Sequence, residues 1–324
     1  MVHGGGLDAA MARFGGARSD WLDLSTGINP VSYPLPALDT EVWTRLPDSA
    51  AQERLLRAAR AAWTAPAGAA LLPAPGTSAL IARLPALDDP GTVWIPGPTY
   101  SEHARSFRAA GWTVAEGDTC PANATAAVLV SPDNPTGRIW AADDLPDLPL
   151  RILDLSFADL EATPALMAEA ARPGTIILRG LGKFWGLAGL RLGAAVGDPD
   201  LLDRLGQMLG PWPVSGPALA VGTAALEDHD WITATRARLA ADSARMVALL
   251  ARHGLNRIGG TALFHLCEHA ESKQLFTRLA RQHILTRPFA HTPTWLRIGL
   301  PGPEADWARF DAALSTMEPP HDPC

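Results

Sequence analysis

Short apolar runs alternate with helix-length segments through the middle of the chain, at residues 92–95, 126–130, 152–153 and 175–178. Most of these runs are rich in β-branched residues and bordered by glycine or proline, which is typical of strands buried on both faces. The segment that ends at Gly111, between the first two runs, has the pattern of a crossover helix. Strand, helix and strand in repetition predict a doubly wound, mostly parallel α/β sheet.

The segments on either side of this alternation have different patterns. Residues 48–63 have an apolar face and a capping residue, Asp48 or Ser49, which predicts a helix before the sheet. Residues 216–254 predict a long helical segment that ends at Gly254. The alanine-rich stretch at 69–76 is interpreted as a composition bias.

The last part of the chain predicts a small α+β domain. Three expected strands surround one expected helix at 271–283, and the strands lie at 260–268, 284–291 and 295–300. Glycine and proline punctuate the N-terminal residues. The predicted organisation is an N-terminal arm at 1–35, a large domain at 36–225 and a small domain at 226–324.

Composition limits the classes of protein to consider. The chain has 324 residues, of which 47% are apolar and 19% charged, as expected of a folded globular protein. A net charge of −7 argues against a nucleic-acid-binding protein. The three cysteines, Cys120, Cys267 and Cys324, are far apart, so we expect neither a disulfide framework nor a zinc site, and a cytoplasmic location. We also expect no signal peptide and no membrane span.

Polar residues follow the predicted strands, at the edge of the sheet where α/β proteins bind their ligands. Tyr100 follows the first run, Asn134 follows the second, Asp154 ends the third and Lys183 follows the fourth. Each has an ordinary structural explanation when taken singly, such as a turn or a helix cap. An aromatic ring, an amide, a carboxylate and a lysine at neighbouring strand ends together indicate one ligand site.

Gly76, Thr77 and Ser78 precede a helical segment and predict an anion site. The N–H groups at the start of a helix, together with two hydroxyls, can bind a phosphate, although the same tripeptide is also a common helix cap.

Lys183 lies among apolar residues and glycines, with Arg191 eight residues later. Desolvation and a nearby cation lower the pKa of a lysine, and a neutral amine can form a Schiff base with an aldehyde.

Pyridoxal 5'-phosphate (PLP) fits this whole set of side chains. Its aldehyde suits Lys183, and its protonated pyridine ring needs a carboxylate, which Asp154 supplies. Tyr100 would stack on the ring and Asn134 would bind the ring hydroxyl. The cofactor-binding residues predicted in this way are Gly76, Thr77, Ser78, Tyr100, Asn134, Asp154, Lys183 and Arg191. We expect Lys183 and Asp154 to be the catalytic residues.

Five segments between residues 75 and 193 resemble the fold-type I PLP enzymes of the class I/II aminotransferase group. They are PGTSALI, PGPTY, SPDNPTGR, LDLSFADL and GKFWGLAGLRLG. The N-terminal segments HGG, at 3–5, and STGINP, at 25–30, look closest to the threonine-phosphate decarboxylase family of cobalamin biosynthesis. The resemblance covers the whole chain, and it implies a large PLP-binding domain with a small α+β domain.

The resemblance also implies an activity and a set of substrate residues. Enzymes of this family decarboxylate O-phospho-L-threonine to (R)-1-amino-2-propanol O-phosphate, so we expect a phosphorylated amino acid as substrate. The family's substrate residues correspond here to His3, Gly4, Asn134, Arg287 and Arg297. Arg297 would bind the carboxylate, whereas Arg287 and His3 would bind the phosphate.

Three positions depart from the pattern of this family. Gly27 stands where the family often has asparagine, Gly180 where it commonly has a phosphate-binding serine, and Phe157 where it often has tyrosine. The phosphate site would therefore have at least one hydroxyl fewer. Fold-type I sites are usually completed by a second subunit, so we expect a homodimer. Tyr33 would either reach the partner's phosphate site or lie at the surface beside Pro34.

Two other functions stay open at this point. A transaminase, such as one acting on histidinol phosphate, would use the same lysine, aspartate and arginines. What separates it from a lyase is the bond at Cα that stands perpendicular to the cofactor ring, which the sequence does not show. The HGG segment favours the lyase by analogy. A non-catalytic protein built on this fold is the third alternative, and the presence of Lys183 argues against it.

Overall fold

The structure is a computed structural model, and it describes residues 4–160 and 164–315. The chain divides into two compact units, each considered by itself below. Unit 1 contains Met1–Val31 and Thr235–Cys324, and unit 2 contains Ser32–Ala234. Helix α9, at His229–Arg252, runs through the boundary between them. None of the helices that lie within the described ranges is both long and apolar enough to cross a membrane.

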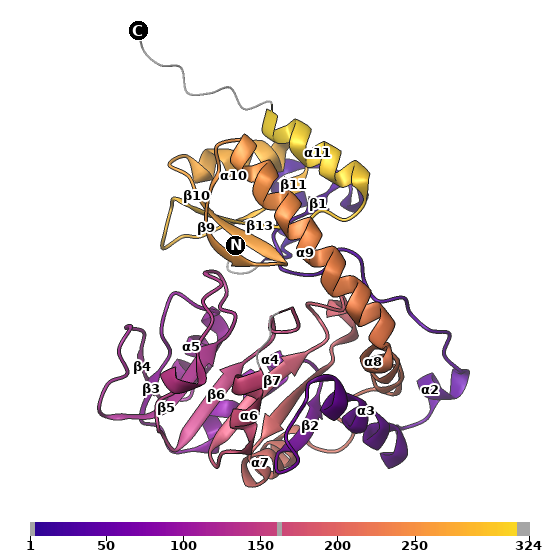
Figure 1. The fold of residues 1–324 in the computed structure, drawn as a ribbon, viewed down its shortest axis with the longest axis vertical. Helices are drawn as coiled ribbons and strands as arrows, with labels where there is room; N and C mark the ends of the chain where they lie inside the picture. Colours follow the sequence, from indigo (N-terminus) through magenta and orange to yellow (C-terminus); the bar gives the residue numbers. More distant parts are fainter. Residues whose placement is uncertain (1–3, 161–163, 316–324) are drawn as a thin grey trace. The chain divides into compact units, whose positions relative to one another are not determined.

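Unit 2 contains a seven-stranded sheet with the strand order β2-β8-β7-β6-β5-β3-β4, counted over the described residues (Figure 1). The strands are β2 (Ala70–Ala74), β3 (Thr92–Trp94), β4 (Thr113–Ala115), β5 (Ala124–Val130), β6 (Leu150–Asp154), β7 (Thr175–Gly180) and β8 (Gly193–Gly197). Strands β3 to β7 are parallel to their neighbours in this group, whereas β8 is antiparallel to both β2 and β7. The prediction of a mostly parallel α/β sheet is confirmed.

Helices cover this sheet because its strands are apolar on both faces. The helices of unit 2 are α2 (Thr40–Thr44), α3 (Ser49–Ala62), α4 (Thr77–Ile81), α5 (Ser101–Ala109), α6 (Pro164–Ala168), α7 (Pro199–Leu209) and α8 (Gly216–Glu227). One core cluster joins Leu80 of α4, Phe107 of α5 and Leu205 of α7 to Val128 and Ile152 of the sheet. Each such side chain contributes about 1.5–3 kcal/mol by leaving water.

Three strands of this sheet, β2, β4 and β8, were not predicted from the sequence. The alanine-rich stretch at 69–76, interpreted as a composition bias, contains β2, at Ala70–Ala74. Strand β8 contains few β-branched residues because close packing excludes them. A Cβ on Gly193 would lie 2.7 Å from the backbone nitrogen of Thr77, and one on Gly197 would lie 2.1 Å from the carbonyl oxygen of Thr175.

Unit 1 is a small α+β structure with two sheets. A four-stranded antiparallel sheet has the order β12-β13-β10-β9, and β1 pairs with β11 in parallel, counted over residues 4–31 and 235–315. The elements are α1 (Leu7–Phe14), β1 (Leu22–Asp23), β9 (Asn256–Thr261), β10 (Phe264–Glu268), α10 (Ser272–Arg281), β11 (Ile284–Leu285), β12 (Arg287–Pro288), β13 (Trp295–Gly299) and α11 (Glu304–Ser315).

Three expectations for the C-terminal part of the chain need correction. The single strand expected at 260–268 is the end of β9 and the whole of β10, which pair with each other. The single strand expected at 284–291 is divided at Thr286 into β11 and β12, which pair in different sheets. The long helical segment expected at 216–254 is two helices, α8 and α9, which meet at Asp228. The Asp228 carboxylate accepts a hydrogen bond of 2.9 Å from the backbone N–H of Trp231, so it caps the start of α9.

Candidate active site

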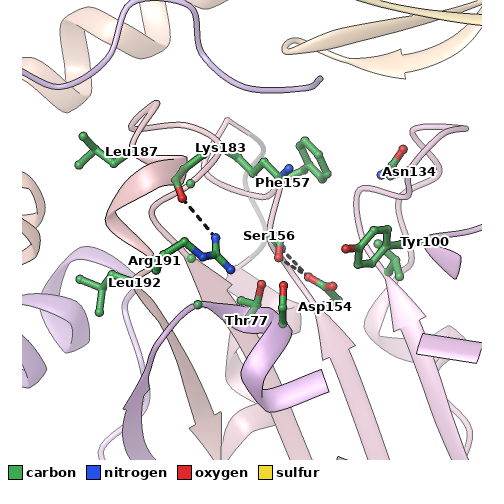
Figure 2. A pocket seen from close by; sticks show the side chains of 16 residues that line it. Thr77, Tyr100, Asn134, Asp154, Ser156, Phe157, Lys183, Leu187, Arg191 and Leu192 are labelled. Carbon is green, nitrogen blue, oxygen red and sulfur yellow. Dashed lines mark hydrogen bonds between the residues drawn. The ribbon is translucent and has the colours of Figure 1, made fainter. Parts of the chain in front are cut away.

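A pocket of about 220 Å³ lies in unit 2, where three neighbouring parallel strands end. Val130 of β5, Asp154 of β6 and Gly180 of β7 are the last residues of their strands, and all three line it. The structure brings all eight predicted cofactor-binding residues to this pocket, namely Gly76, Thr77, Ser78, Tyr100, Asn134, Asp154, Lys183 and Arg191. The edge of the sheet chosen from the sequence is therefore where these side chains meet (Figure 2).

Asp154 is buried at the pocket, and both of its carboxylate oxygens have hydrogen-bond partners. Its Oδ2 lies 2.9 Å from His103 Nε2, and its Oδ1 accepts the backbone N–H of Ser156 at 3.0 Å and also the Ser156 hydroxyl (Figure 2). Burial alone raises the pKa of Asp154, but the hydrogen bond and charge of His103 and the hydrogen bonds from Ser156 outweigh burial, so the pKa is lower than usual. The side chain is therefore a carboxylate at neutral pH.

His103 belongs to this site but was not singled out from the sequence. It lies in the first turn of α5, is fully buried, and its ring meets that of Tyr100 edge-on at 6.0 Å. A carboxylate only accepts hydrogen bonds, so Nε2 carries the proton that points to Asp154. A signal was present, because His103 and Phe107 are four residues apart on the buried face of one helix.

Arg191 and the Gly76-Thr77 turn lie together at the pocket, where the sequence predicts a phosphate site. Gly76 has φ +82°, a backbone conformation that favours glycine, and a Cβ there would lie 2.6 Å from Arg191 Nη2 and displace the guanidinium. Arg191 Nη1 donates to the carbonyl of Ala188 at 3.2 Å (Figure 2). Helix α4 begins at Thr77, as the sequence predicts, and has five residues. Its first N–H groups, the hydroxyls of Thr77 and Ser78, and the Arg191 guanidinium are the donors near this turn.

Lys183 lines the pocket, and the two residues that follow it are tightly packed. Its Nζ lies 5.2 Å from the centre of the Phe157 ring, while Phe184 and Trp185 are almost completely buried. Lys183 itself is half-buried and Arg191 is exposed. The expectation of dry surroundings therefore holds for the neighbours but not for the lysine, because its side chain faces the pocket rather than the core.

Two of the three departures from the family pattern border the pocket. A Cβ on Gly180 would lie 3.4 Å from the Thr77 methyl group, so this position adjoins the phosphate site without adding a donor to it. Phe157 presents a ring where the family often has a phenol. Both departures from the family pattern therefore lie at the pocket, where the resemblance predicts the cofactor.

Arg287 and Arg297 lie directly opposite one another on the paired strands β12 and β13 of unit 1. The Arg297 guanidinium is buried, donates to the carbonyl of Ser25 at 2.6 Å, and lies 4.9 Å from the Phe264 ring centre. Burial and, after it, the charge of Arg287 lower the pKa of Arg297 to about 9 against the opposing effect of Asp23. Two positively charged side chains on directly paired residues favour the binding of anions.

Gly4 lies beside this arginine pair, and a Cβ there would lie 3.3 Å from Arg297 Nη2 and 2.3 Å from the carbonyl oxygen of Ser25. Unit 1 therefore brings together Gly4 and the two arginines among the predicted substrate residues. His3 lies outside the described residues.

Tyr33 lies in unit 2, where its side chain is buried and its hydroxyl donates to the Ala224 carbonyl at 3.2 Å. The surface position for Tyr33 was wrong.

The family model for aminotransferase class I and II matches residues 34–310. The chain belongs to this family. It is 43% identical to a threonine-phosphate decarboxylase from Sinorhizobium sp, with 98% of each chain covered. It is 41% identical to a threonine-phosphate decarboxylase from Pseudomonas aeruginosa, with 99% of this chain and 100% of the relative covered.

In the sequence comparison, a relative with another activity aligns over less of the chain. A histidinol-phosphate aminotransferase from Symbiobacterium thermophilum is 32% identical over 63% of this chain and 61% of its own. Among solved structures, histidinol-phosphate aminotransferase from Sinorhizobium meliloti in complex with pyridoxal-5'-phosphate superposes with a TM-score of 0.81, at 20% identity, covering 95% of this chain and 93% of that one. This aminotransferase class I and II protein has the fold-type I architecture.

Proposed function

We propose that this chain is a PLP-dependent threonine-phosphate decarboxylase, which converts O-phospho-L-threonine to (R)-1-amino-2-propanol O-phosphate in cobalamin biosynthesis. The observation that carries the proposal is identity of 41–43% to two threonine-phosphate decarboxylases over essentially the whole length of each chain. The histidinol-phosphate aminotransferase relative aligns over 63% of this chain. The pocket and the arginine pair supply the groups that such a reaction needs.

The residues of the pocket fit PLP. Thr77 and Arg191, with Gly76 lacking the Cβ that would obstruct the guanidinium, would hold the phosphate, and Asp154 would hold the pyridine nitrogen. Tyr100 would cover the ring and Asn134 would bind its hydroxyl. When bound, PLP supplies an electron sink for the charge that develops on the substrate Cα as carbon dioxide leaves.

Two side chains of the pocket have defined tasks in this reaction. The carboxylate of Asp154, kept ionised by His103 and Ser156, stabilises a proton on the group it faces. Lys183 Nζ is the amine suited to hold an aldehyde covalently. Decarboxylation replaces a C–C bond at Cα with a C–H bond, so one proton must be delivered to Cα. We assign that proton to Lys183 Nζ.

O-Phospho-L-threonine carries two anionic groups, and the cross-strand pair Arg287 and Arg297 offers two guanidinium groups for them. Planar guanidinium groups bind carboxylate and phosphate in bidentate fashion. We assign the carboxylate to Arg297, and the phosphate to Arg287 with His3.

Arg287→Ala is expected to lower activity on O-phosphothreonine by more than about tenfold, since a hydrogen-bonded charge contributes on the order of 2 kcal/mol. Binding of unphosphorylated threonine should be unchanged. Isothermal titration with both ligands, together with steady-state kinetics, measures the difference. Arg281→Ala, which removes an exposed arginine of α10, is the matched control. Equal loss of affinity for both ligands would place the phosphate contact elsewhere.

Arg191→Ala is expected to weaken PLP affinity by about tenfold to a hundredfold, because it removes a charge-assisted contact worth on the order of 2 kcal/mol. Turnover at saturating PLP should change much less. Fluorescence titration of the cofactor-free protein gives the dissociation constant. Arg57→Ala, on the exposed side of α3, serves as the control. An unchanged dissociation constant for Arg191→Ala would remove this residue from the phosphate site.

Product analysis with O-phospho-L-threonine, with and without 2-oxoglutarate, tests the reaction class. A decarboxylase forms 1-amino-2-propanol O-phosphate and carbon dioxide without 2-oxoglutarate. A transaminase instead forms glutamate only when 2-oxoglutarate is present. Glutamate formation without release of carbon dioxide would overturn the assignment in favour of the transaminase.

We further infer that the enzyme is a homodimer in the cytoplasm. Four large apolar side chains of unit 2, Leu35, Trp43, Leu46 and Trp212, are each more than half exposed, at 70%, 67%, 67% and 57%. Aromatic and aliphatic side chains exposed to this extent are typical of surfaces that a partner covers. The cytoplasmic location is inferred from the cysteine usage.

A further inference from the structure

One buried carboxylate connects the two loops that carry Tyr100 and Asn134. Asp133 is 5% exposed and accepts hydrogen bonds from the Thr136 hydroxyl at 2.6 Å and the Thr136 N–H at 3.2 Å. It also accepts the hydroxyl of Thr99, which immediately precedes Tyr100. Tyr100 and Asn134 line the pocket, whereas Asp133 itself does not. The carboxylate therefore lies behind the two side chains that it connects.

The bond between Thr99 and Asp133 joins segments that are 34 residues apart in the sequence. Thr99 lies in the loop after β3 and Asp133 in the loop after β5, and these strands are neighbours in the sheet. The second loop is also closed on itself, because Asp133 N–H donates to the Arg138 carbonyl at 2.8 Å and Gly137 N–H donates to the Asp133 carbonyl at 2.8 Å. The Thr99 hydroxyl is thus bonded to a loop that is already held in place.

We propose that Asp133 is a positioning residue, which fixes the Tyr100 ring and the Asn134 amide relative to one another across the pocket. Figure 2 shows these two side chains on the same side of the pocket, away from Arg191. That both side chains bind PLP rests on the proposed function, which assigns the ring face to Tyr100 and the ring hydroxyl to Asn134. The connection between the loops belongs to the chain itself and can be measured without a ligand.

A carboxylate suits this position better than the isosteric amide. Both oxygens of Asp133 only accept, and the surrounding groups, two threonine hydroxyls and one N–H, can all donate. Asparagine would place its NH₂ group against Thr99, whose hydroxyl would have to accept instead of donate, and it would remove the charge that strengthens these hydrogen bonds. Burial raises the pKa of Asp133, and the hydrogen bonds of Thr136 and Thr99 offset part of that effect. Without the Thr99 hydroxyl, fewer hydrogen bonds would offset the free-energy cost of burying this carboxylate.

The chain contains only two tyrosines, Tyr33 and Tyr100, which allows a direct measurement of the loop. In protein labelled with 3-fluorotyrosine, the fluorine spectrum has two resonances, and Tyr33→Phe assigns them. Asp133→Asn and Thr99→Val are each expected to shift or broaden the Tyr100 resonance in the cofactor-free protein. The Tyr33 resonance should not change, because its hydroxyl is bonded to Ala224 on another part of unit 2. Asp118→Asn, at an exposed aspartate, is the control for loss of charge.

The same variants are expected to weaken PLP affinity by about tenfold, the range for loss of a hydrogen bond to a charged group. The double variant should be no weaker than Asp133→Asn alone, because both changes break one connection. An unchanged Tyr100 resonance in Asp133→Asn or Thr99→Val overturns the proposal. Equal changes of both tyrosine resonances, with a lower melting temperature, would also overturn it, since they indicate a general structural role.

The outcomes separate this proposal from the proposed function. Wild-type protein that takes up no PLP would contradict the proposed function, and the fluorine spectra of the cofactor-free protein would still decide the role of Asp133. If Asp133→Asn does not fold, Thr99→Val removes the same connection with a smaller change and gives the same test. Normal PLP uptake by wild type, combined with unchanged affinity in Thr99→Val, would refute the positioning role alone.

Discussion

Replacing Lys183 by alanine is expected to lower decarboxylation of O-phospho-L-threonine by at least about a thousandfold, because both covalent attachment and proton delivery depend on its Nζ. Wild-type protein with PLP should absorb near the edge of the visible range and lose that band on borohydride reduction, and Lys183→Ala should lack the band. The chain has only two lysines, Lys183 and Lys273, so the reduced label can be located by one peptide map.

Lys273 provides a matched control for this experiment. It is exposed on α10, and Lys273→Ala should retain the band, the label and the activity. A label on Lys273, or a wild-type protein that shows no band at any PLP concentration, would contradict the assignment of Lys183.

Asp154→Asn is expected to bind PLP but to lose about a hundredfold or more in turnover, because a neutral amide does not stabilise a proton on the pyridine nitrogen. The substitution also removes the charge that faces His103. Turnover at saturating PLP and the PLP dissociation constant are the two measurements, with Asp118→Asn as the control. Near-normal turnover would reassign Asp154 to a structural role.

The lowered pKa of Asp154 also fixes the sign of its effect on stability. A carboxyl group with a lower pKa in the folded state stabilises the fold above its usual pKa, and this contribution is lost as the pH falls through the lowered value. Asp154→Asn should therefore show a smaller loss of stability between neutral and acidic pH than wild type. Thermal unfolding over that range measures the difference.

The strand-end argument predicted the pocket well because it depends on topology rather than on detail. Parallel neighbours end at one edge of a sheet, so residues that follow consecutive strands meet there whatever the exact strand limits. Strand β6 illustrates this: only Ile152 and Leu153 were predicted, because Arg151 interrupts the apolar run. Arg151 is buried and bonded to Thr175 and to the Pro173 carbonyl, which no local pattern shows.

What could not be predicted depends on contacts between distant segments. Strand β8 lacks a strand-like composition because Gly193 must pass close to Thr77. His103 comes from a helix, so the strand-end argument did not include it, and its value lies in the bond to Asp154, 51 residues away. The positions of Arg287 and Arg297 opposite one another follow from the register of β12 and β13, and β12, with only two residues, does not reveal that register in the sequence.

The two ends of the chain share one unit, and this has a consequence for synthesis on the ribosome. Strand β1, at Leu22–Asp23, is among the first segments to emerge, yet it pairs with β11, at Ile284–Leu285. All of Ser32–Ala234, with its own sheet, is made in between. Because domains tend to fold in the order in which they emerge, unit 2 can fold first. The nascent N-terminal segment must then wait, unpaired, until translation is almost complete.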